Sequence, residues 1–208
     1  MVLRILMRSL CAVAGLLLGP GVPWAADPED PDWPCIQRKV PEISAGMVWA
    51  GPPVEGLERE WRAEAEVAAL AQRIAARSTP VEDGKKAIEA LAARQGSGKD
   101  QKLTLLFAAT LAAVNTERNS IIVGIKRYAR RQAKLAEKIQ HQIEELNQLP
   151  YDGTEEQNAR RRELEERQQW DTRIYEERER SLSYICDQPV ILEQRIFSLA
   201  REIMMHLD

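Results

Sequence analysis

The feature that most constrains this chain is an unbroken heptad pattern from Lys99 to Leu149. Ten of the fourteen positions that repeat at alternating spacings of three and four residues are apolar, and no proline interrupts the stretch. The pattern predicts one helix about 75 Å long with a coiled-coil-like face. The four polar positions either set the register of the pairing or mark breaks in it. The fourteen positions, hereafter the seam, are Thr104, Phe107, Leu111, Val114, Arg118, Ile121, Ile125, Tyr128, Gln132, Leu135, Ile139, Gln142, Leu146 and Leu149.

A turn and a returning helix follow this segment. Four residues suited to a tight turn end the pattern, and Thr154 with Gln157 forms a capping box that restarts a helix. Residues 154–187 should therefore run back antiparallel to residues 99–149 as a long hairpin. We predict that the hairpin tip is an interaction site. The tip residues are Pro150, Tyr151, Asp152 and Gly153.

The charges of the two helices predict how they pair. If the turn centres between residues 151 and 152, residue i faces residue 303 − i. Lys126 and Arg127 then face Glu177 and Glu176, which would give ion pairs beside the seam. The alternative is that the basic cluster binds an anionic ligand. This cluster comprises Lys126, Arg127, Arg130, Arg131 and Lys134.

The remaining helices should form a globular base at the open end of the hairpin. Amphipathic spacing predicts helices over residues 57–77 and 81–95, and Asp187-Gln188-Pro189 starts a last helix over residues 188–207. The last helix is apolar over most of its circumference, so it is either central to the core or buried in a partner. Residues 103–114 are almost wholly apolar but too short to span a membrane, which favours a core position. The predicted fold is all-α, with residues 55–208 as one helical domain.

The first 26 residues have the features of a secretory signal. Arg4 and Arg8 precede an apolar stretch, and Ala25-Ala26 precedes an acidic run. Cleavage after Ala26 would release a periplasmic or secreted protein. The alternative is an uncleaved inner-membrane anchor.

Residues 27–54 differ from the rest of the chain. Six prolines exclude a regular helix or strand, while Trp33 and Trp49 give the segment side chains that a solvated linker lacks. We predict an extended arm laid over the helical body, with a disordered tail as the alternative.

Two cysteines remain once Cys11, within the predicted signal, is removed. Cys35 and Cys186 lie near opposite ends of the mature chain. Export to an oxidising compartment predicts that they form one long-range disulfide.

Charge and motifs exclude several functions. Without residues 1–26 the chain has 27 basic and 32 acidic residues, a net charge of −5 that disfavours nucleic-acid binding. No nucleophile motif or phosphate-binding loop is present, so we expect no catalytic activity and no cofactor. Met204, Met205 and His206 are weak candidates for a soft-metal site, although methionine is also common in cores.

These features predict an exported interaction or scaffold protein that acts through its hairpin or its apolar last helix. The expected partner is another protein or a second copy of the chain, and contact with a membrane surface or the cell envelope is left open. The alternative function is a periplasmic ligand- or metal-binding module that uses the last helix and the N-terminal arm.

Overall fold

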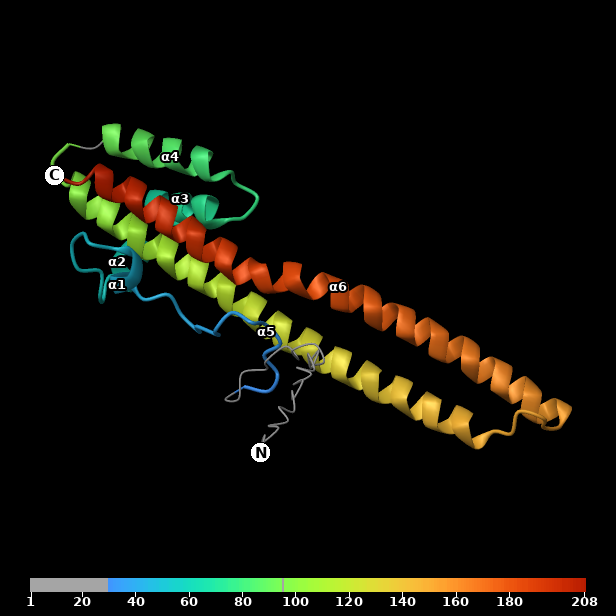
Figure 1. Cartoon of the computed structure of the whole chain (residues 1–208). Coiled ribbons are helices and arrows are strands. Elements are labelled where there is room, and N and C mark those ends of the chain that lie inside the picture. Colours follow the sequence, from blue (N-terminus) through green and yellow to red (C-terminus); the bar gives the residue numbers. More distant parts are fainter. Residues whose placement is uncertain (1–29, 95) are drawn as a thin grey trace, which may run out of the picture.

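The long helix predicted by the heptad pattern is present. The computed structural model describes residues 30–94 and 96–208, in which α5 spans Lys99–Gln148 (Figure 1). Gly98 precedes α5 with a φ of +100°, a left-handed conformation that glycine adopts at little cost. The predicted signal, residues 1–26, lies outside the described residues.

The seam identifies the contact face of α5 correctly. All fourteen seam positions are buried or half-buried. The four polar seam residues are all buried, so they belong to the pairing rather than to breaks in it. These residues are Thr104, Arg118, Gln132 and Gln142.

The returning segment and the predicted last helix are one helix. α6 spans Glu155–Met205, so the prediction of a separate helix starting near residue 188 was wrong (Figure 1). Its N-terminus has the predicted capping box, in which Thr154 Oγ1 accepts from the Gln157 amide and Gln157 Oε1 accepts from the Thr154 amide.

Pro189 lies inside α6 and does not end it. Proline has no N–H to donate to the Ile185 carbonyl, which normally breaks a helix. Here the buried Pro189 ring continues the apolar face formed by Leu182, Cys186 and Leu192. Packing of this face offsets the lost hydrogen bond, so tertiary contacts override the local propensity.

The hairpin register differs from the predicted one. Tyr128 Oη donates to the Arg178 carbonyl at 2.6 Å, whereas the prediction paired Tyr128 with Tyr175. Lys138 pairs with Asp171 rather than with Glu165. The side chains of a helix tilt toward its N-terminus, which lies at the base for α5 and at the tip for α6. A side chain of α5 therefore contacts a residue of α6 that lies closer to the base than the residue directly opposite. The prediction counted residues from the turn and ignored this tilt.

The helical base surrounds the open end of the hairpin. The predicted helix over residues 57–77 is split at Glu64 into α2, Glu58–Ala63, and α3, Ala65–Ala75, while α4 spans Val81–Arg94. Glu64 has φ −88° and ψ 88°, which lies outside the helical region. The largest fully buried side chains of the base are Val67, Ile74, Ile88, Leu91, Leu103, Leu106, Phe107, Leu192, Ile196, Leu199 and Ile203.

The last turns of α6 belong to this core. The buried apolar residues after Pro189, among them Leu192, Ile196 and Leu199, pack into the base core with α4 and the start of α5, so this face of the last helix is central to the base. Ile191, Phe197 and Met205 lie outside this face and are exposed. Among the described residues, no helix combines the length and apolarity needed to span a bilayer.

The arm crosses α5 and α6, and one turn of it is helical. α1, Ala45–Val48, was not predicted, because the surrounding prolines hid it. The following Trp49 stacks on Phe107 with ring centroids 4.0 Å apart and planes 5° apart. The described part of the arm therefore packs on the helical body as predicted.

Candidate functional site

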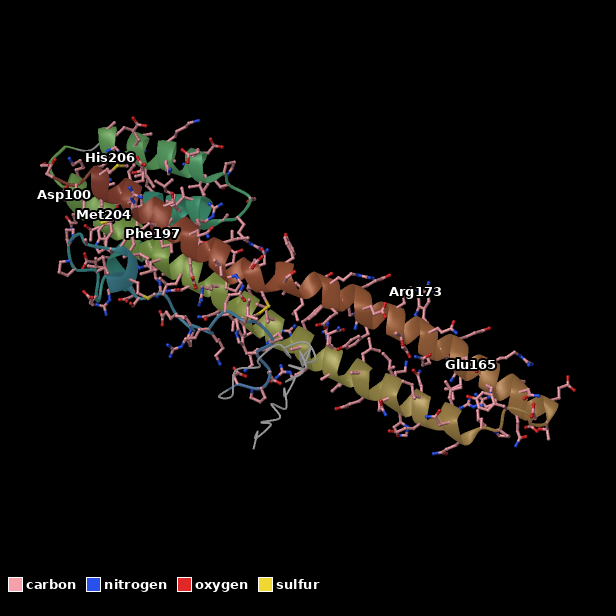
Figure 2. All side chains as sticks on the ribbon, viewed as in Figure 1. Asp100, Glu165, Arg173, Phe197, Met204 and His206 are labelled. Carbon is pink, nitrogen blue, oxygen red and sulfur yellow. A yellow bond between two sulfur atoms is a disulfide. The ribbon has the colours of Figure 1, made fainter. Side chains whose placement is uncertain are left out.

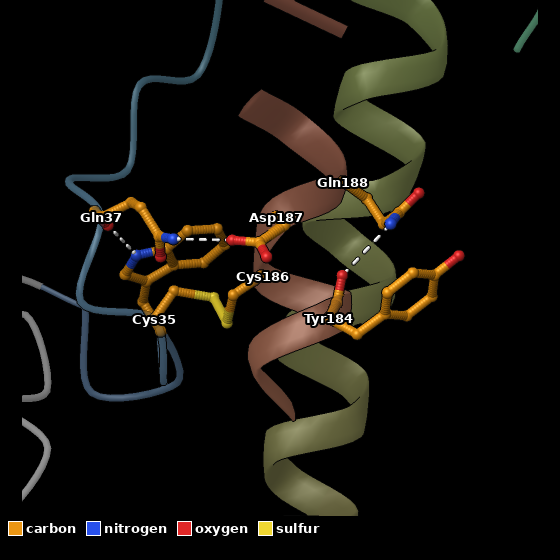
Figure 3. The surroundings of a disulfide bond; sticks show 7 residues. Cys35, Gln37, Tyr184, Cys186, Asp187 and Gln188 are labelled. Atoms are coloured by element: carbon orange, nitrogen blue, oxygen red, sulfur yellow. Dashed lines mark hydrogen bonds between the residues drawn. A yellow bond between two sulfur atoms is a disulfide. The ribbon is translucent and has the colours of Figure 1, made fainter. Parts of the chain in front are cut away.

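A disulfide joins the arm to α6, as predicted. Cys35 and Cys186 are bonded and each is only 3% exposed (Figure 3). They lie in a small apolar cluster that also contains Trp33 and Leu182. Gln37 Nε2 donates to Asp187 Oδ1 at 3.2 Å beside the bond. A buried disulfide of this kind is typical of a protein in an oxidising compartment.

Two residues of the basic cluster of α5, Lys126 and Arg130, pair with acids of the arm and not with the predicted acids of α6. Asp30 pairs with Lys39 and, at 3.0 Å, with Lys126. Asp32 pairs with Arg130 at 3.0 Å. Hydrogen bonds from the two lysines lower the pKa of Asp30 below its ordinary value. The predicted pairs with Glu176 and Glu177 do not form because the register is displaced and the arm supplies closer carboxylates.

A buried arginine connects the second half of the arm to both long helices. Arg118 is 2% exposed, donates to the Val40 carbonyl and pairs with Glu193 of α6 at 2.5 Å. Asn115 forms two hydrogen bonds with the Ile43 backbone, at 3.0 and 2.9 Å. These contacts satisfy backbone groups of a segment that has no sheet or helix partner, so they are structural.

The outer half of the hairpin has a polar contact face. Gln142 Nε2 and Lys138 Nζ each lie 2.8 Å from Asp171 Oδ2, which is buried between the helices. Burial raises the pKa of Asp171, but the hydrogen bonds and the Lys138 charge outweigh it and leave the pKa below its ordinary value. Over residues 126–181 Leu164 is the one fully buried apolar side chain. Polar contacts therefore set the pairing here with little apolar stabilisation.

The predicted interaction tip is ordered and exposes an aromatic ring. Tyr151 is 85% exposed, and the Arg161 guanidinium lies 4.4 Å from its ring centroid. Arg161 also donates to the Leu146 and Leu149 carbonyls at the end of α5, where the Leu146 carbonyl accepts from the Leu149 amide as well. Arg161 therefore fixes the tip, and the Tyr151 ring remains accessible.

A stripe of large apolar side chains runs along the outer face of α6. Trp170, Tyr184, Ile191 and Met205 are separated by multiples of seven residues, and their exposed fractions run from 42% to 69%. The contact face of α6 repeats with the same period, so this outer stripe stays on one exposed flank of the helix beside the contact face. Arg173, labelled in Figure 2, lies with its guanidinium 5.7 Å from the Trp170 ring centroid.

The weak metal candidates at the end of α6 point to different partners. Met204 Sδ accepts from the Ala50 amide at 3.3 Å, whereas Met205 lies in the exposed stripe. His206 Nε2 lies 3.2 Å from Glu202 Oε1 on the preceding turn (Figure 2). Within residues 30–94 and 96–208, no three His, Cys, Asp or Glu side chains cluster as metal ligands would.

The sequence-based reasoning missed the outer stripe and the heptad repeat of α6. The repeat can be read in the sequence as Leu164, Asp171, Ile185, Leu192 and Leu199, all at multiples of seven residues. The repeat is hard to recognise because polar residues occupy part of it and Pro189 favours the start of a new helix. The pairing of Asp30 and Asp32 with α5 had no sequence signal, since it depends on the path of the arm.

Comparisons with protein-family models, with curated proteins and with solved structures found no match to this chain.

Proposed function

We propose that this chain is an exported interaction protein that uses its hairpin to bind the helix of a partner protein. The observation that carries the proposal is the outer stripe of α6. Exposed large apolar side chains are unfavourable in water, and tryptophan and tyrosine, both present in this stripe, are enriched at the centres of protein interfaces. A stripe that repeats every seven residues suits contact with another helix.

The rest of the architecture supports this role. The base and the disulfide hold the inner ends of α5 and α6, while the outer hairpin projects away from the base (Figure 1). The polar contact face of the outer hairpin fixes the register at the cost of stability, as buried polar residues do in coiled coils. The Tyr151 ring at the tip extends the accessible aromatic surface. No catalytic activity is part of the proposal.

The proposed location is the periplasm or the extracellular space. The buried disulfide supports an oxidising compartment, and the pattern of residues 1–26 supports cleavage after Ala26. Mass spectrometry of the protein recovered from the producing cell tests this. A first residue at Asp27 and the absence of free thiols are expected, whereas an intact N-terminus would favour the membrane-anchored alternative.

Site-specific photocrosslinking in the producing cell tests the interaction. A photoreactive residue at Glu177, within the outer stripe, should give a defined adduct, and one at Asp152 tests the tip. The matched control is Glu144, which is exposed on α5 outside the stripe. The adduct at position 177 should disappear in the background Trp170→Ser/Tyr184→Ser.

Light scattering on the purified protein separates a partner protein from self-association. A mass of two chains that falls to one in the Trp170→Ser/Tyr184→Ser variant identifies a second copy as the partner. A monomer with an adduct identifies a different protein. A monomer that gives no adduct at position 177, or one that gives an equal adduct at position 144, would refute the proposal.

A further inference from the structure

A small cavity lies where the arm meets the hairpin, just outward of the disulfide cluster. It measures about 220 Å³ and is walled by Pro31 and Pro34 of the arm, Tyr128 of α5 and Leu182 of α6. Three segments that are distant in sequence therefore form one concave apolar surface. Ligand sites are commonly built in this way, from apolar walls with a few polar groups.

The walls of the cavity are fixed before any ligand binds. Two ion pairs, Asp30 with Lys126 and Asp32 with Arg130, hold the arm on either side of Pro31. The hydrogen bond from Tyr128 Oη to the Arg178 carbonyl orients the tyrosine ring. Binding of a ligand in the cavity would therefore lose little conformational entropy of the protein, which favours affinity.

The polar residues that line the cavity are Gln132 and Glu179. Gln132 is more than nine-tenths buried, and its Nε2 donates to the Tyr175 carbonyl at 3.2 Å. Its Oε1 has no hydrogen-bond partner among the described residues. The Glu179 carboxylate also lines the cavity, and no ion pair to it occurs within residues 30–94 and 96–208. Gln132 Oε1 is itself covered, so the group that a ligand in the cavity can pair with is the Glu179 carboxylate, which favours a positively charged ligand.

We propose that this cavity binds an organic ammonium group carried on an apolar body. The apolar body would occupy the space between the two prolines, Tyr128 and Leu182. The ammonium group would pair with the Glu179 carboxylate, because it supplies three donors and a positive charge. A free aryl-alkyl amine and a lysine side chain of a polypeptide both offer this chemistry. The site is independent of the outer stripe.

Binding can be measured by amide and side-chain NMR shifts of the isotope-labelled protein. Phenethylamine is the first probe, and phenethyl alcohol is its neutral counterpart with the same ring. Phenethylamine should shift the Gln132 side-chain amide and residues around Tyr128, and should bind about tenfold more tightly than the alcohol, which lacks the charge. Nα-acetyl-lysine amide represents the polypeptide source, so the tighter of the two ammonium probes indicates which source the site prefers.

Variants separate this site from general electrostatic attraction. Glu179→Gln should weaken phenethylamine binding about tenfold. Glu177→Gln removes the same charge from an exposed residue two positions away and should leave the affinity for phenethylamine unchanged.

Three results would overturn the proposal. The first is the absence of any shift with either ammonium probe at about 1 mM, a concentration that detects binding of about −4 kcal/mol. The second is equal binding of phenethyl alcohol and phenethylamine. The third is an equal loss of affinity for phenethylamine in Glu179→Gln and in Glu177→Gln. None of these outcomes bears on the crosslinking at the outer stripe, so the two proposals fail separately.

Discussion

Replacing Cys35 and Cys186 together with alanine should lower the free energy of unfolding by about 5 kcal/mol. The bond closes a loop with a sequence separation of 151 residues, and the chain-entropy relation gives about 5 kcal/mol for a loop of that length. A typical domain has a total stability of about 5–15 kcal/mol. Loss of the bond should therefore remove a large share of the stability.

Two measurements test this prediction at different levels. Urea denaturation followed by circular dichroism gives the global change, read as the shift in midpoint at constant slope. Limited trypsin digestion gives the local change. The arm before Val40 should be cut faster after Lys39 in the variant, because Asn115 and Arg118 still hold residues 40–43 while the preceding residues lose their covalent attachment.

A matched control removes exposed side chains next to the bond. Ile36→Ala/Tyr184→Ala changes the residue that follows Cys35 and the residue two positions before Cys186, and both side chains are exposed. This control should change the stability by less than about 1 kcal/mol. If the alanine variant at the cysteines unfolds with the same midpoint as the oxidised protein, the loop-entropy reasoning is refuted. An equal decrease in the free energy of unfolding in the control variant would show that contacts of the neighbouring side chains, and not the disulfide, account for the loss of stability.

Three further changes have defined outcomes. Phe107→Ala should lower the free energy of unfolding, measured by urea denaturation, by about 3–5 kcal/mol, because the ring is fully buried and its removal leaves a cavity. A decrease of less than about 1 kcal/mol would contradict this. The outer hairpin should be fully stabilised by Asp171 above its ordinary pKa of 3.8 and should lose that contribution as the pH falls through its lowered folded pKa. Hydrogen exchange near residues 138–142 should rise in that acid range, and Asp171→Asn should remove this dependence on pH. Pro189→Ala restores an N–H for the Ile185 carbonyl and should raise the melting temperature; a lower value would show that α6 needs the proline for its path.

The fold could be predicted because its main signals are local. The heptad spacing from Thr104 to Leu149 identified one face of α5, and the capping box at Thr154 placed the start of α6 within one residue. Both depend on interactions between residues three or four apart. The break at Glu64 and the single turn at α1 were not predicted, because α2 and α3 pack on α5 and α1 packs on α6, and these contacts join segments far apart in the chain.

The candidate sites were predictable only in part. The disulfide followed from the count and position of the cysteines, and the tip followed from turn residues. The outer stripe needs the knowledge that α6 is continuous, since Trp170 and Met205 lie on opposite sides of Pro189 in the sequence. The cavity at the arm needs the path of Pro31 and Pro34 over the hairpin, which no local pattern encodes.

The sequence by itself determined that the chain folds back as a long helical hairpin with its ends joined by one bond, because periodicity, turn chemistry and cysteine number are properties of short segments. The tertiary structure decided the register, the continuity of α6 and the pairing of Asp30 and Asp32 with α5. These depend on where side chains meet across helices that are far apart in the chain. The tilt of the side chains and the free energy of apolar burial determine which residues come into contact, and neither can be derived from one segment alone.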